Sequence, residues 1–97
     1  MIDIPVIYLD DPSYLMEGLF YEELKEEYDI FFRRVLKVVE GDYIERCTPI
    51  VSLLDGLSES YLYLDTDNEI ELLKRSLKYF EWIEEYETCA VIFKRLP

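Results

Sequence analysis

Two long stretches of this chain carry apolar residues at helical spacing, and they constrain the fold more than any other feature of the sequence. Between positions 19 and 39 the apolar residues recur at steps of three or four; they are Phe20, Leu24, Tyr28, Phe31, Val35 and Val38. A second stripe consists of Ile70, Leu73, Leu77, Phe80 and Ile83. Each pattern predicts a long amphipathic helix whose apolar face packs against another element.

Local signals mark the ends of these two helices. Arg33, Arg34 and Lys37 fall in the last turns of the first helix, where the helix dipole favours cations, and Gly41 stands where a C-terminal cap belongs. The run Thr-Asp-Asn-Glu at 66–69 has the form of a capping box, which predicts that the second helix begins there.

Three further segments are predicted to be strands. Residues 2–9 are rich in β-branched and aromatic residues, and Pro5 favours an edge or strand-start position because it has no amide hydrogen. Residues 60–64 form a second candidate. Residues 88–96 contain the apolar run CAVIF, which predicts a central strand buried on both faces.

The segment from 42 to 58 has two interpretations. Thr48 and Pro49 resemble a helix cap and a first-turn proline, which predicts a short helix through Leu54 that ends at Gly56; extended structure is the alternative. With the short helix, the order is strand, helix, short helix, strand, helix, strand. This order predicts one compact domain over residues 1–97, of α/β or α+β class, in which a small three-stranded sheet packs against two long helices.

Charge is the feature that bears most on function. The 97 residues include 22 Asp and Glu against 10 Lys and Arg, with no histidine, for a net charge of −12. The acids alternate with apolar residues in a chain that is 51% hydrophobic, so they must lie on a folded surface. Self-repulsion of this size opposes the compact state. The charge is also uneven, because residues 1–32 contain nine acids and one base.

Several function classes lack the residues they need. Without histidine there is no Ser-His-Asp or Cys-His arrangement, and the chain has no glycine-rich phosphate loop. The acidic runs at 10–11 and 65–69 are interpreted as turns and helix caps rather than as cation sites. We therefore expect no enzyme activity, no cofactor and no metal. Direct binding of nucleic acid is rejected because phosphates would be repelled.

The location of the protein and the state of its cysteines are predicted from the lack of a membrane-spanning run, a signal peptide and a cysteine motif. The longest apolar run, at 89–93, is too short to cross a bilayer, and the N-terminus lacks the features of a signal peptide. These observations predict a cytoplasmic protein, in a cell or in an infected host. Cys47 and Cys89 are isolated thiols and are predicted to be small apolar core residues.

Some acids occupy positions that helix stability disfavours. Glu22 and Glu23 each precede another glutamate by four residues, and each such pair costs an isolated helix about 0.2–0.5 kcal/mol. The second helix is predicted to end in a cluster of glutamates, where a cation would be favoured by about 0.3–1 kcal/mol. Such local conflicts tend to fall at functional sites. They predict an electronegative face, with interleaved tyrosines, that binds a basic protein.

The sequence therefore predicts a small acidic inhibitor or decoy that blocks a basic nucleic-acid-binding enzyme, of the immunity, antitoxin or phage anti-defence type. The residues predicted to contact that partner are Tyr21, Glu22, Glu23, Glu26, Glu27, Tyr28, Asp29, Glu81, Glu84, Glu85 and Tyr86. The main alternative is a homo-oligomeric structural or adaptor module with no inhibitory role, whose apolar helix stripes pack against a second copy of the chain. An enzyme that binds a metal through carboxylates ranks third.

Overall fold

The computed structural model describes residues 4–8, 15, 21–42, 47–55 and 58–97. The elements along these residues are, in order, β1 (Val6–Tyr8), α2 (Lys25–Lys37), the π-helical turn η1 (Val38–Asp42), β2 (Cys47–Asp55), β3 (Ser58–Asp65), α3 (Glu69–Trp82) and α4 (Tyr86–Arg95). The Cα radius of gyration is 12.9 Å, close to the value of about 13 Å for a compact domain of this length. The chain forms a compact α+β fold, as predicted, but the predicted order of elements is wrong in two places.

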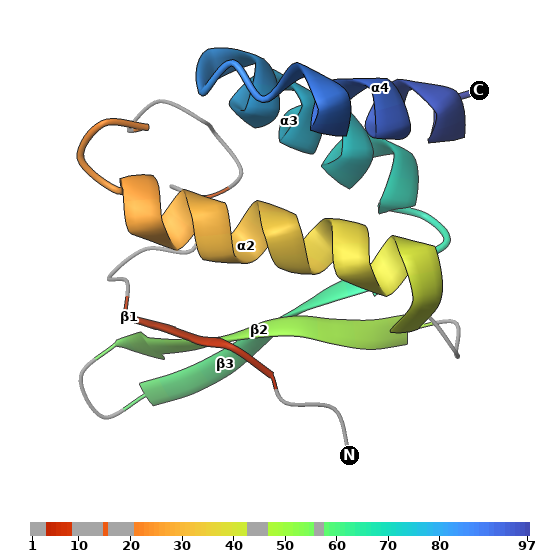
Figure 1. Cartoon of the computed structure of the whole chain (residues 1–97). Coiled ribbons are helices and arrows are strands. Elements are labelled where there is room, and N and C mark those ends of the chain that lie inside the picture. The colour runs from red at the N-terminus through yellow and green to blue at the C-terminus, as the bar shows by residue number, and fades with distance from the viewer. Residues whose placement is uncertain (1–3, 9–14, 16–20, 43–46, 56–57) are drawn as a thin grey trace.

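The described strands form one sheet in the order β1, β2, β3 (Figure 1). Strand β1 is parallel to β2, and β2 is antiparallel to β3. The register aligns Val6 with Ser52 and Ser52 with Tyr61, so these three residues share one face of the sheet. Strand β1 lies at an edge, which agrees with the position of Pro5 just before it.

The short helix predicted within 48–54 is wrong, because this segment is the central strand β2. Its backbone pairs with β1 on one side and β3 on the other, and these two ladders outweigh a weak local capping signal. The proline that suggested a helix start is tolerated here because the register shifts between Pro49 and Val51. Prolines within sheets are confined to such irregularities and to edges.

The C-terminal strand predicted at 88–96 is also wrong, because these residues lie in helix α4. A short apolar run does not reveal its period. In the structure Ile92 is fully buried, whereas Val91 and Phe93 are 41% and 70% exposed. Cys89 and Leu96, at helical steps from Ile92, pack against the core. The run is therefore amphipathic, and α4 packs on α3 (Figure 1).

The two long predicted helices correspond to α2 and α3, with shifted ends. Residues 16–20 lie outside the described residues, and α2 begins at Lys25 after a turn at 21–24. Gly41 does not cap α2 but lies inside η1. The capping box at 66–69 is wrong as well. The N-cap of α3 is Asn68, and the Oδ1 atom of Asp65 accepts hydrogen bonds from the backbone N–H groups of Asp67 and Asn68, both at 2.9 Å.

The helices lie on one face of the sheet, with α2 next to the strands and with α3 and α4 beyond it (Figure 1). The core between them is aromatic. Tyr28 and Phe32 of α2 and Tyr79 of α3 are fully buried, and the ring centroids of Phe32 and Tyr79 are 5.3 Å apart. The thiol of Cys89 is free and half-buried, while the side chain of Cys47 lies outside the described residues.

Candidate partner-binding surface

The structure brings the two predicted acidic segments to the same end of the molecule. Tyr21, just before α2, packs against Trp82 at the end of α3, with ring centroids 5.3 Å apart. Tyr21 also meets Tyr79 at 5.6 Å. The start of α2 and the turn between α3 and α4 therefore lie side by side (Figure 1). We define the acidic end as Glu22, Glu23, Glu26, Glu27, Glu81 and Glu84.

The carboxylates of the acidic end face solvent. Five of the six are exposed and Glu27 is half-buried. Among the described residues, none of the six forms a salt bridge with a lysine or arginine. Like charges gathered on one end of a protein sum to a field that attracts cationic molecules. The acidic end thus has the exposure and the electrostatics that a contact surface for a basic protein requires.

The prediction that repulsion between glutamates four residues apart destabilises the first helix is wrong. Because the helix begins at Lys25, Glu22 and Glu23 lie in the preceding turn and are not helical neighbours of the glutamates four residues on. Glu26 and Glu27 fall in the first turn of α2. There the positive end of the helix dipole stabilises a carboxylate, typically by about 0.3–1 kcal/mol.

The expected strain at the end of the second helix is only partly present. Helix α3 ends at Trp82, and no basic residue lies in its last turn, so Glu81 does face the negative end of the dipole. Glu85 is instead the N-cap residue of α4, and Glu87 lies in the first turn of α4. Both of these carboxylates occupy positions that the dipole of α4 favours.

Glu84 is the strained residue of the acidic end. Its φ angle is +62°, the only positive value among the described residues other than glycine. The backbone N–H of Glu84 donates to the carbonyl of Glu81 (3.1 Å) and that of Glu85 donates to the carbonyl of Phe80 (2.9 Å). This is the Schellman arrangement, which usually places glycine at the left-handed position. An exposed glutamate there is consistent with a functional role, since such strain gathers at functional sites.

We expect Glu84→Gly to stabilise the protein. A residue with a Cβ in the left-handed conformation costs about 1–2 kcal/mol, and glycine removes this cost. Glycine also makes the unfolded chain more flexible, which lowers the free energy of unfolding by about 0.5–1 kcal/mol. The net gain is about 0.5–1 kcal/mol, or a rise of roughly 4 °C in melting temperature by circular dichroism. Glu84→Ala is the matched control, because it removes the same carboxylate but keeps the strain. Equal melting temperatures for Glu84→Gly and Glu84→Ala would show that the backbone at position 84 is not strained.

Two predicted contact residues, Asp29 and Glu85, are already paired with Arg33 inside the protein. Arg33 donates from Nε to Asp29 Oδ2 at 2.8 Å, and its two terminal nitrogens donate to Glu85 at 3.1 and 2.7 Å. The hydroxyl of Tyr79 donates to Asp29 Oδ1 at 2.8 Å, and the hydroxyl of Thr88 donates to Glu85. Asp29 and Glu85 thus join α2 to α3 and α4, and we leave them out of the acidic end.

This network shifts two pKa values. Hydrogen bonds from Arg33 and then from Thr88 lower the pKa of Glu85 below its ordinary 4.5. Burial, followed by the hydrogen bond to Asp29, raises the pKa of Tyr79 well above 10.0. A group with a depressed folded pKa stabilises the fold at pH values above its unfolded pKa. The contribution of Glu85 is therefore complete at neutral pH and is lost as the pH falls through its folded pKa.

Arg33→Met should make stability less sensitive to acid. Because the variant removes the first cause of the lowered pKa of Glu85, its melting temperature should fall less than that of the wild type as the pH is lowered from about 5 to about 3, the range in which the contribution of Glu85 is lost. Arg75→Met is the control; it removes a 2.9 Å pair with Glu71 inside α3. Parallel curves of melting temperature against pH for the wild type and Arg33→Met would contradict the proposed linkage.

The three predicted contact tyrosines differ in surroundings. Tyr28 has no exposed surface, so its prediction as a contact residue is corrected: it belongs to the aromatic core. Tyr21 is half-buried against Trp82. Tyr86 is 65% exposed and begins α4, directly after the strained turn. Tyr86 and the 42% exposed Trp82 supply aromatic surface beside the acidic end.

The outer face of α4 is a feature that the sequence analysis missed. Tyr86, Ala90 and Phe93, at steps of four and three, are all exposed. The helical spacing was readable in the sequence, but the assignment of 88–96 to a strand concealed it. An exposed apolar stripe beside carboxylates is typical of protein contact surfaces, in which an apolar centre is surrounded by a polar rim.

Other kinds of site find no support in the described part of the chain. Within those residues no group of three or more cysteines and carboxylates is placed to hold a metal ion. No helix in the same residues is long and apolar enough to cross a membrane. Comparison with known proteins gives no relative, since no family model, no curated protein and no solved structure matches the chain.

Proposed function

We propose that the protein is a small inhibitor or decoy that binds a basic, nucleic-acid-processing enzyme through its acidic end. The observation that carries the proposal is the convergence of mostly exposed glutamates from the start of α2 and from the α3–α4 turn, none of which forms a salt bridge among the described residues. Such a surface speeds association with a cationic cleft by about 10- to 1,000-fold. It also competes with the phosphates that the cleft normally binds.

The strained turn supports the same proposal. Glu84 keeps a carboxylate at a left-handed position where glycine would be more stable. Glu81 keeps another at the unfavourable end of the dipole of α3. Stability alone favours neither residue, whereas capture of a basic partner makes use of both. We further propose that the complex forms in the cytoplasm, of a cell or of an infected host, and that the protein acts as an immunity protein, antitoxin or anti-defence protein.

Aromatic residues next to the acids supply the attraction that charge alone does not. Binding energy at protein interfaces concentrates in a few aromatic and arginine anchors, while rim charges mainly set the association rate. Tyr86 and Phe93 are exposed on α4, and Trp82 lies at the acidic end. We expect these residues to meet apolar or arginine side chains of the partner.

The test is capture from an extract of the source cell on immobilised protein. We expect a basic nucleic-acid-binding enzyme that is released by raised salt and displaced by duplex DNA. A variant with Glu22, Glu26, Glu81 and Glu84 changed to Gln should retain much less of it. Capture of partners that are insensitive both to salt and to DNA, or equal capture by this variant, would overturn the proposal.

A second function, a homo-oligomeric module, is favoured by the face of the sheet that the helices leave bare. Tyr8 is 75% exposed, and Tyr61 and Tyr63 are 43% and 45% exposed, with ring centroids 6.2 Å apart. Self-association through this face would persist at high salt, because it buries apolar surface. Light scattering decides: a dimer mass that is constant across salt concentrations supports the module, and a monomer mass excludes it.

A further inference from the structure

An open groove of about 420 Å³ separates α2 and η1 from α4. Its lining residues are Arg33, Leu36, Lys37, Glu40, Glu87, Thr88 and Val91. The volume falls at the small end of the range of about 300–1,000 Å³ that ligand sites occupy. The groove begins beside the acidic end, because Glu87 lies three residues after Glu84 in the chain.

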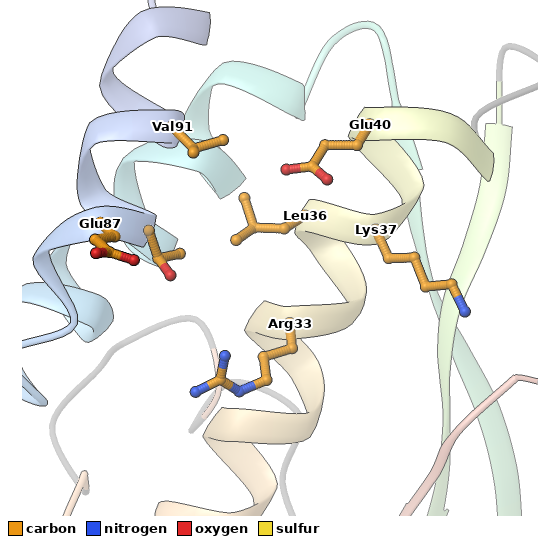
Figure 2. A pocket seen from close by; sticks show the side chains of 7 residues that line it. Arg33, Leu36, Lys37, Glu40, Glu87 and Val91 are labelled. Carbon is orange, nitrogen blue, oxygen red and sulfur yellow. The ribbon is translucent and has the colours of Figure 1, made fainter.

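The groove is lined by both apolar side chains and carboxylates. Figure 2 shows Leu36 of α2 and Val91 of α4 projecting into it from opposite helices. Glu40 directs its carboxylate into the same space, and Glu87 lies on the α4 wall (Figure 2). The groove therefore presents a short apolar surface between two carboxylates that belong to different elements.

The two cations that line the groove do not cancel these carboxylates. Arg33 is bound to Asp29 and Glu85, which together outweigh its charge. The amino group of Lys37 points away from the groove (Figure 2). In the described residues Glu40 and Glu87 form no salt bridge with a lysine or arginine. The charge that the groove offers to a ligand is therefore negative.

We propose that this groove binds an arginine side chain of the basic partner; the inference rests on the proposed function and assigns it a subsite. The aliphatic stem would lie against Leu36 and Val91, while the guanidinium would reach Glu40 and Glu87. Arginine fits better than lysine for two reasons. Its guanidinium carries donors on several edges and so can serve two carboxylates, and it is less strongly hydrated than an ammonium group.

The subsite and the acidic end have different tasks. Exposed charges accelerate encounter over distances near the Debye length, about 10 Å at 0.1 M salt. A side chain seated between two elements instead slows dissociation and fixes the orientation of the partner. Changes in the groove should therefore alter the dissociation rate, and changes at the acidic end should alter the association rate.

The probe is acetyl-arginine N-methylamide, titrated into the protein while the methyl resonances of Leu36 and Val91 are recorded by NMR. We expect both methyl groups to shift. Acetyl-citrulline N-methylamide, which has nearly the same shape without the charge, should shift neither. Glu40→Gln and Glu87→Gln should each weaken binding about fivefold, the change expected for loss of one partly exposed ion pair. Glu71→Gln on α3 is the matched control and should leave the affinity unchanged.

Three results would overturn the inference: unmoved methyl groups at all arginine concentrations, equal shifts with the citrulline compound, or equal binding of the corresponding lysine compound. None of these affects the proposed function, which is tested by the glutamates of the acidic end. Conversely, suppose that the acidic-end variant captures the partner as well as the wild type does, while the arginine compound still binds in the groove. That result would contradict the proposed function and would support the assignment of the groove as an arginine site.

Discussion

Phe32→Ala should destabilise the protein by about 3–5 kcal/mol, the usual cost of truncating a buried phenylalanine. Phe32 has no exposed surface and lies in the middle of the aromatic core, with ring centroids 5.9 Å from Tyr28 and 5.3 Å from Tyr79. The loss comprises the transfer energy of the ring and the cavity that it leaves. Small domains have only about 5–15 kcal/mol of stability in total, so most of the margin would be lost.

The measurement is urea unfolding followed by circular dichroism, in which the midpoint should fall while the slope stays constant. Phe93→Ala is the matched control. Phe93 is 70% exposed on the outer face of α4, so its removal should change stability by no more than about 0.5 kcal/mol. A large loss for Phe93→Ala would show that this face is covered in solution, which would favour self-association.

The two long helices were predictable because each keeps one apolar stripe over several turns. Phe31 and Phe80, for example, were placed on the buried faces by spacing alone, and both are fully buried. Long periodic segments tolerate errors at their ends, and the ends are where the prediction failed. Helix α2 begins at Lys25, later than predicted. After Trp82 a turn leads from α3 into a further helix, α4, whereas a strand was predicted to follow the second helix.

The other two elements were predicted wrongly, for opposite reasons. Strand β2 is defined by pairing with residues far away in the chain, and no local signal competes with two hydrogen-bonded neighbours. Helix α4 does have a local signal, the helical spacing of Cys89, Ile92 and Leu96, all of which pack in or against the core. An apolar run of five residues conceals that signal, because every position in it looks equally suited to a core.

The candidate surface was foreseen in its chemistry but not in its arrangement. The sequence identified the glutamates, whereas the contact of Tyr21 with Trp82 unites them, and contacts of this kind depend on how the helices pack. The strain in the helices is also smaller than the sequence predicts. Glu26 and Glu85 occupy favourable helix starts, which leaves Glu81 and Glu84 as the misplaced acids.

Changing Glu22, Glu26, Glu81 and Glu84 together to glutamine should slow association with a basic ligand at least about tenfold at low salt. All four residues are exposed and belong to the acidic end. The fold should be retained, since none of these carboxylates forms a salt bridge within the described residues. The matched control changes Glu59, Glu69 and Glu71 to glutamine and Asp67 to asparagine, which removes the same charge from other surfaces.

The control separates the place of the charge from its amount. Both variants carry the same net charge, so a general attraction between opposite charges would slow association equally in the two. If the acidic end is the surface that recognises the ligand, only the acidic-end variant should associate more slowly. The difference should shrink as salt rises from about 0.01 M to about 0.1 M, because the Debye length falls from about 30 Å to about 10 Å.

The most direct measurement is the stopped-flow association rate of a fluorescent arginine-rich peptide with the wild type and with the two charge-matched variants. The account predicts a loss of at least about tenfold for the acidic-end variant and a change of less than about twofold for the control. Equal losses in both variants would contradict it, because the acids would then act only as a diffuse charge and not as a surface built to receive a partner.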